Sequence, residues 1–120
     1  MTPEQFELAR AVEQHPLWKT VHEGLLVRFE WSPDPDYPGQ ERIDLDSWAT
    51  IGGLLGILQA TGEVQVEFLS DKTVVQWPGY QDWGPEPGTQ LAKALLHRWD
   101  NELRHLWDAD EGLDGVEEDA

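Results

Sequence analysis

Residues 63–77 read EVQVEFLSDKTVVQW, and this stretch decides the fold. Apolar and polar side chains alternate over residues 63–69, which predicts a strand with one face in water. Residues 70–72, SDK, supply turn chemistry, and residues 73–77 return as the antiparallel partner. The stretch therefore predicts a β-hairpin with one buried face, which amphipathic helices would cover.

Three segments around this hairpin have helical spacing of their apolar residues and polar residues suited to capping. They are residues 3–14 after the cap Thr2, residues 48–61 after the cap Asp46 or Ser47, and residues 90–107 after the cap Thr89. Pro16 is expected to stop the first helix, and Gly62 the second. In the last helix Arg98 and Glu102 stand four residues apart, the spacing of a favourable ion pair.

A further strand is predicted over residues 25–31, and residues 32–40 and 78–88 are predicted loops because Pro, Gly and Asp gather there. The order is then α-β-α-β-β-α. The fold class is α+β, with a three-stranded, largely antiparallel sheet and helices packed on one face. Residues 1–107 form a single globular domain, and residues 108–120, with seven acids and no base, a disordered acidic tail.

The chain carries 24 acidic residues against eight basic ones, a formal charge of −16. This balance disfavours direct binding to nucleic acid or to an anionic membrane, and it favours a basic protein surface as partner. Plain solubility is the alternative reason for such a charge. Cysteine is absent, and no apolar run approaches the roughly 20 residues of a membrane span, so a cytoplasmic location in the host cell is expected.

No catalytic, metal-binding or cofactor-binding constellation is recognisable. The four histidines lack the spacing of a zinc site, and the serines lack a nucleophile elbow. An enzyme is therefore not expected, and neither a metal nor a cofactor is.

Five of the seven tryptophans fall into two groups. Trp18, Trp48 and Trp99 fit core positions, whereas Trp77 and Trp83, with Tyr80, flank the Pro and Gly residues of a predicted loop. Loop aromatics either cover a small core or serve as exposed anchors for a partner. On the second helix, Gly52 and Gly56 share one face, so an element of the same chain or a partner chain is expected to pack closely there.

Three segments carry a family resemblance: His15-Pro16-Leu17-Trp18, Gly24-Leu25, and DLDSWATIGGLL over residues 44–55. They resemble a pattern in a family of small uncharacterised proteins encoded by phages and prophages, over roughly residues 8–60. The resemblance implies a shared capped helix and a phage origin. Phage proteins of this size and acidity are similar to DNA mimics, which place carboxylates where a basic groove expects phosphates.

The leading hypothesis is a small acidic accessory binding protein, such as an inhibitor, that docks on a basic surface of a host nucleic-acid-handling protein. The alternative is a structural protein that forms homo-oligomers through the Gly52/Gly56 face or through the Trp-rich loop, and an enzyme acting on small molecules is the weakest hypothesis. The residues expected to bind the partner are Asp34, Asp36, Trp77, Tyr80, Asp82, Trp83, Asp108, Asp110, Glu111, Asp114, Glu117, Glu118 and Asp119.

Overall fold

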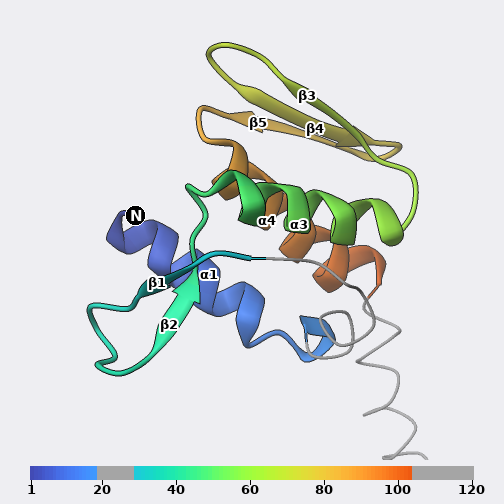
Figure 1. Cartoon of the computed structure of the whole chain (residues 1–120). Helices are drawn as coiled ribbons and strands as arrows, with labels where there is room; N and C mark the ends of the chain where they lie inside the picture. Colours follow the sequence, from blue (N-terminus) through green and yellow to red (C-terminus); the bar gives the residue numbers. More distant parts are fainter. Residues whose placement is uncertain (19–28, 104–120) are drawn as a thin grey trace, which may run out of the picture.

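The computed structural model of the chain describes residues 1–18 and 29–103 (Figure 1). It shows a mixed α+β fold with helices and two antiparallel sheets, one of three strands and one of two. The predicted fold class is therefore confirmed. The prediction of which strands belong to which sheet is only partly right. The strands that differ from the prediction determine which side chains reach the surface.

The larger sheet consists of β3 (Gln65–Phe68), β4 (Thr73–Trp77) and β5 (Tyr80–Gly84), in the order β3-β4-β5. β4 alternates between buried and half-buried residues, with Thr73, Val75 and Trp77 on the buried face. Val75 pairs with Val66 on one side and with Asp82 on the other, and all pairings are antiparallel. The hairpin predicted from residues 63–77 is present as expected.

β5 lies where a loop was predicted. Pro78 and Gly79 form a two-residue turn that brings Tyr80 opposite Trp77. Pro at the first central position and Gly, with φ of 93°, at the second are the residues that a type II turn prefers. The Pro and Gly residues therefore mark the turn and the end of a strand, and the residues between them pair with β4.

Two helices cover one face of this sheet, as predicted (Figure 1). They are α3 (Trp48–Ala60), with Ser47 as its N-cap, and α4 (Pro87–His97). α4 packs against α3, β4, β5 and α1, so it lies at the centre of the molecule. The fully buried side chains gather around it and include Leu54, Ile57, Leu58, Leu91, Leu95 and Trp99.

α1 (Pro3–Glu13) packs on the opposite side of α4 from the sheet (Figure 1). Its predicted capping box is present: the Thr2 side chain accepts from the backbone N–H of Gln5, and the Gln5 side chain accepts from the N–H of Thr2. The helix ends at the C-cap Gln14, as expected.

A short hairpin of β1 (Trp31–Pro33) and β2 (Glu41–Ile43) lies beside α1. The prediction of one loop over residues 32–40 is therefore wrong at its start, and β2 was missed. A three-residue strand carries almost no alternation signal, because only its pairing with β1 reveals it. Of the predicted strand over residues 25–31, residues 25–28 lie outside the described part of the chain, and Trp31 begins β1.

The last helix differs from its prediction at both ends. It begins at Pro87 with Glu86 as the N-cap, and Thr89 donates its hydroxyl to Glu86. After His97 the chain continues as a π-helix, η1 (Arg98–Glu102), and residues from 104 onward, including the predicted acidic tail, lie outside the described part. The predicted Arg98–Glu102 pair does not form.

Trp48 is the clearest error in the predicted core. Trp18 and Trp99 are buried as expected, whereas Trp48 is 69% exposed at the first turn of α3. The residue stands at the first position of the helix, one turn before the buried Ile51. The apolar character of Trp48 predicted a buried position, but the orientation of α3 leaves its side chain exposed.

Gly88 gives a direct test of how α4 is seated. A Cβ at this position would lie 1.8 Å from the backbone carbonyl oxygen of Leu45, and backbone cannot move aside as a side chain can. We expect Gly88→Ala to lower the free energy of unfolding by about 1–3 kcal/mol, measured by urea unfolding. Gly52→Ala is the matched control, because a Cβ there meets no atom within 4 Å. It should be neutral or stabilising, and a Gly88→Ala protein as stable as the original would contradict this seating.

Candidate docking surface

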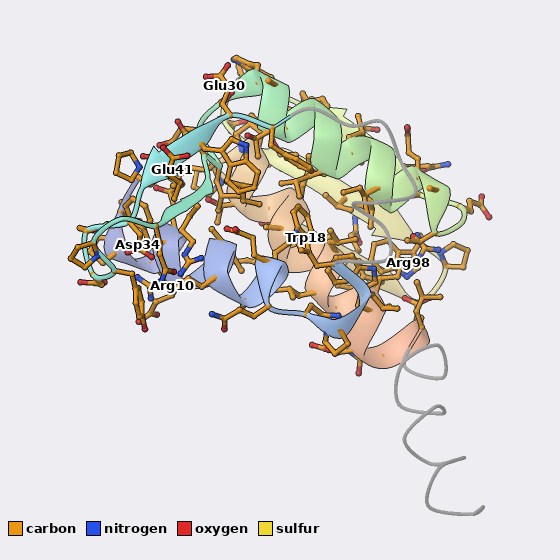
Figure 2. All side chains as sticks on the ribbon, turned by 60° about the horizontal axis from the view of Figure 1, so that its bottom comes forward. Arg10, Trp18, Glu30, Asp34, Glu41 and Arg98 are labelled. Carbon is orange, nitrogen blue, oxygen red and sulfur yellow. The ribbon has the colours of Figure 1, made fainter. Side chains whose placement is uncertain are left out.

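The side chain of Asp34 is fully buried and holds two arginines (Figure 2). Arg10 of α1 donates from Nε to Asp34 Oδ2 at 2.9 Å, and Arg42 of β2 donates from Nε to the same oxygen at 2.9 Å. The other oxygen, Oδ1, accepts the backbone N–H of Asp36 at 2.9 Å. One carboxylate therefore ties the hairpin turn to α1 and neutralises part of the charge of two cations.

Neighbouring groups complete this network. The ring of Tyr37 lies against both guanidinium groups, with its centroid 4.9 Å from Cζ of Arg10 and 5.5 Å from Cζ of Arg42. Glu13 accepts the backbone N–H of Ile43 at 3.1 Å and lies 3.9 Å from Arg42. Burial raises the pKa of the Glu13 carboxyl. The two arginines are thus engaged by acceptors of the same chain.

Asp34 was predicted to be a partner-binding residue, and the structure contradicts this. Hydrogen bonds from Arg10, with further bonds from Asp36 and Arg42, lower the pKa of Asp34 to about 2. The carboxylate is charged, but it is buried and fully engaged within the chain, so no partner can reach it. Asp36 is exposed as predicted, and it shares Arg10 at 2.9 Å.

Arg98 is the third arginine of the described residues, and it is buried as well. Its Nη1 donates to the carbonyl of Glu63 at 2.9 Å, and its Cζ lies 4.5 Å from the ring centroid of Trp77. Trp77 donates its indole N–H to Glu102. Arg98 therefore pins the end of α4 to the sheet through a cation–π contact, and its charge does not reach the surface freely.

The predicted aromatic anchors separate into inner and outer residues. Trp77 is 6% exposed, so it is a core residue and not an anchor. Tyr80 is half-buried and stacks on Trp77 with 4.1 Å between ring centroids, and burial raises its pKa to about 12. Trp83, at 58% exposed, is available to a partner. Of the three aromatic residues in this group, Trp83 alone is exposed.

Because Arg42 and Arg98 are buried and Arg10 is half-buried, almost all exposed charges of the described residues are negative. Lys93 is the one exposed Lys or Arg among residues 1–18 and 29–103, and Lys72 is half-buried. Twelve acids are exposed over the same residues. They are Glu4, Glu7, Glu30, Asp36, Glu41, Asp46, Glu63, Glu67, Asp71, Glu86, Asp100 and Glu102.

Two adjoining hollows concentrate part of this charge. The first, of about 410 Å³, lies between the N-terminal halves of α1 and α4, and its charged lining residues are Glu4, Glu7, Glu86 and Lys93. The second, of about 330 Å³, shares Glu4, Glu86 and Lys93 with the first and adds Asp82 and Trp83. Acids therefore outnumber the single lysine four to one in the two hollows. We call these two hollows the acidic groove, defined by Glu4, Glu7, Asp82, Trp83 and Glu86.

Hydrogen bonds hold the groove in shape. Gln5, buried beneath it, donates from Nε2 to Asp46 Oδ1 and to Glu86 Oε2, each at 2.9 Å. Asp82 accepts from Gln90 Nε2 at 2.9 Å. Carboxylates that are fixed by amide donors keep their charge directed at a defined place, which favours recognition of a basic surface of complementary shape.

The predicted site residues are only partly brought together. Asp82 and Trp83 line the acidic groove, whereas Asp36 lies on the β1–β2 hairpin. The seven predicted acids of residues 108–119 lie outside the described part of the chain. The prediction missed Glu4, Glu7 and Glu86, although each is an exposed acid in the first turns of a helix or at its cap.

The described residues offer no group of three or more His, Asp or Glu side chains that could hold a metal ion. No helix within the described ranges is both long and apolar enough to cross a membrane. The acidic groove provides fixed negative charge, and the exposed Trp83 lies beside this charge.

Comparisons with family models, with curated proteins and with solved structures give no match to this chain.

The pH dependence of stability tests the buried network around Asp34. A carboxyl whose pKa is lowered on folding stabilises the fold above its unfolded pKa of about 3.9, and this contribution is lost as the pH falls. With the folded pKa of Asp34 at about 2, the loss falls between pH 4 and 2. We expect Asp34→Asn to lower the melting temperature at pH 7, and the difference from the original chain to shrink as the pH falls through this window.

Asp36→Asn is the matched control, because Asp36 contacts the same arginine from an exposed position. It should change the melting temperature far less. Equal effects of the two substitutions, or an Asp34→Asn difference that stays constant down to pH 2, would contradict the network.

Proposed function

We propose that this chain is a small acidic accessory protein of phage type, which docks on a basic surface of a host nucleic-acid-handling protein and inhibits it as a DNA mimic. The single observation that carries the proposal is the separation of charge. Among the described residues Arg42 and Arg98 are buried and Arg10 is half-buried, while twelve acids are exposed against one exposed lysine. Such a surface attracts basic grooves and repels phosphates.

The acidic groove is the docking surface that we propose. Glu4, Glu7 and Glu86 are exposed there, and Trp83 supplies an aromatic side chain of the kind that dominates interface hot spots. The seven acids of residues 108–120 add further negative charge to the chain. The partner is a protein and not nucleic acid or a membrane, and the proposed place of action is the host cytoplasm.

A second candidate function is that of a structural, self-associating phage protein without catalytic activity. The observation that favours it is the exposed face of α3, which carries no charged residue in an otherwise acidic molecule.

The docking proposal is tested by capture and competition. The full chain is immobilised, exposed to nuclease-treated bacterial lysate, and eluted with rising salt. We expect the captured protein to bind duplex DNA, the chain to displace a fluorescent duplex from it, and elution to occur below roughly 0.5 M salt, because screening weakens charge contacts. Capture that survives 0.5 M salt, or a duplex that stays bound at saturating chain, would contradict mimicry.

Two matched triple variants locate the docking surface. Glu4→Gln, Glu7→Gln and Glu86→Gln together remove three charges from the groove, and Glu30→Gln, Glu41→Gln and Glu67→Gln remove three from elsewhere. We expect the groove variant to bind the captured protein roughly tenfold more weakly or worse, and the other to lose far less. Equal losses in the two variants would mean that the total charge, and not the groove, determines binding.

A further inference from the structure

One face of α3 is exposed although it carries no charged residue. The helix reads WATIGGLLGILQA and contains no Asp, Glu, Lys or Arg. A helix that is apolar on all sides is normally buried on all sides. Here Ile51, Leu54 and Leu58 are buried against the core, while Trp48 and Gly52 are exposed and Gly56 is half-buried.

An apolar cluster extends this face onto the sheet. The ring of Trp48 meets that of Phe68 edge to face, with 6.1 Å between centroids. Phe68 is 44% exposed, and its neighbour Leu69 is 48% exposed. Trp48 and Phe68 therefore form one exposed apolar patch at the N-terminal end of α3. Such a patch, free of charge and rich in aromatic groups, has the composition of an interface core.

No contact among the described residues explains the glycine at position 52. Glycine inside a helix costs about 1 kcal/mol relative to alanine. A Cβ at this position would meet no atom within 4 Å, so no described neighbour demands its absence. Within residues 1–18 and 29–103, no element of the same chain packs closely on Gly52, and this side of α3 is open to a second molecule.

The spacing of the residues on this face fits a second copy of the same chain. Trp48, Gly52 and Gly56 follow at four-residue intervals and so lie along one side of the helix. If two α3 helices cross antiparallel about a two-fold axis beside Gly52, Trp48 of each copy lies opposite Gly56 of the other. The bulky side chain of one copy then meets the space left by the glycine of the other, as a self-complementary two-fold interface requires.

The absence of charge on this face of α3 also favours it as the surface for self-association. Two copies of a chain with a net charge of −16 repel each other through most of their surfaces. Contact through α3 brings no ionisable side chain of the helix into the interface. The remaining repulsion between the copies is long-range, and added salt weakens it.

We propose that α3 is the interface of a homodimer, in which Trp48 of each copy seats over Gly56 of the other and the two helices touch at Gly52. This inference rests on self-association, the second candidate function, and gives it a defined surface. It is compatible with docking through the acidic groove, because the two surfaces share no residue.

Sedimentation velocity of the full chain, from micromolar to near-millimolar concentration, tests the dimer. We expect the mass to rise from 13.7 kDa toward twice that value, and the association to strengthen between low salt and 1 M salt. Docking through carboxylates has the opposite salt dependence, so the two proposals can fail separately. A mass of 13.7 kDa at every concentration in 1 M salt would overturn the dimer.

Three variants keep the test specific. Trp48→Ala and Gly52→Glu should each weaken dimerisation roughly tenfold or more, and thermal melts should show both folded, since these positions are exposed. Trp83→Ala, the removal of an equally large exposed tryptophan away from α3, should leave dimerisation unchanged. Dimerisation that persists in both α3 variants, or that is lost in Trp83→Ala, would overturn the proposed interface.

Discussion

The buried carboxylate of Asp34, held between Arg10 and Arg42, is the interaction on which the rest of the structure depends. A buried charge is costly unless it is paired and hydrogen-bonded, and here two Nε donors and a backbone N–H provide the partners. The network fixes the β1–β2 hairpin on α1, since a sheet of two three-residue strands has little stability of its own. It also withdraws two of the chain's few cations from the surface.

The distribution of charge follows from this use of the arginines. Arg98 repeats the pattern at the other end of the molecule, where it connects η1, Glu63 and Trp77. The arginines thus contribute to stability through contacts within the chain, and most of the exposed acids have no Lys or Arg within ion-pair distance among the described residues. The formal charge of −16 understates this separation, because it counts the arginines as if they neutralised the surface. Docking and self-association then use different parts of one surface, the acidic groove and the uncharged face of α3.

Much of the fold could be predicted from local pattern, because caps, alternation and helical spacing are properties of neighbouring residues. The capping box at Thr2, the cap at Ser47 and the hairpin over residues 63–77 belong to this group. Local pattern could not predict β2, the burial of Asp34 or the exposure of Trp48. Each depends on a contact, or the lack of one, between residues far apart in the chain. The same holds for the candidate site. The sequence gives the number of acids, but it does not show which residues surround each acid in space.

The exchange of arginine side-chain protons with water measures directly whether Arg10 and Arg42 are engaged by Asp34. In NMR spectra of the ¹⁵N-labelled chain at neutral pH, the Nε–H protons of Arg10 and Arg42 should exchange with water far more slowly than in the unfolded chain, because Asp34 accepts both. Asp34→Asn should accelerate the exchange of both. If these protons exchange in the folded protein at the rate of the unfolded chain, the arginines are free at the surface, and the acidic surface loses its physical basis.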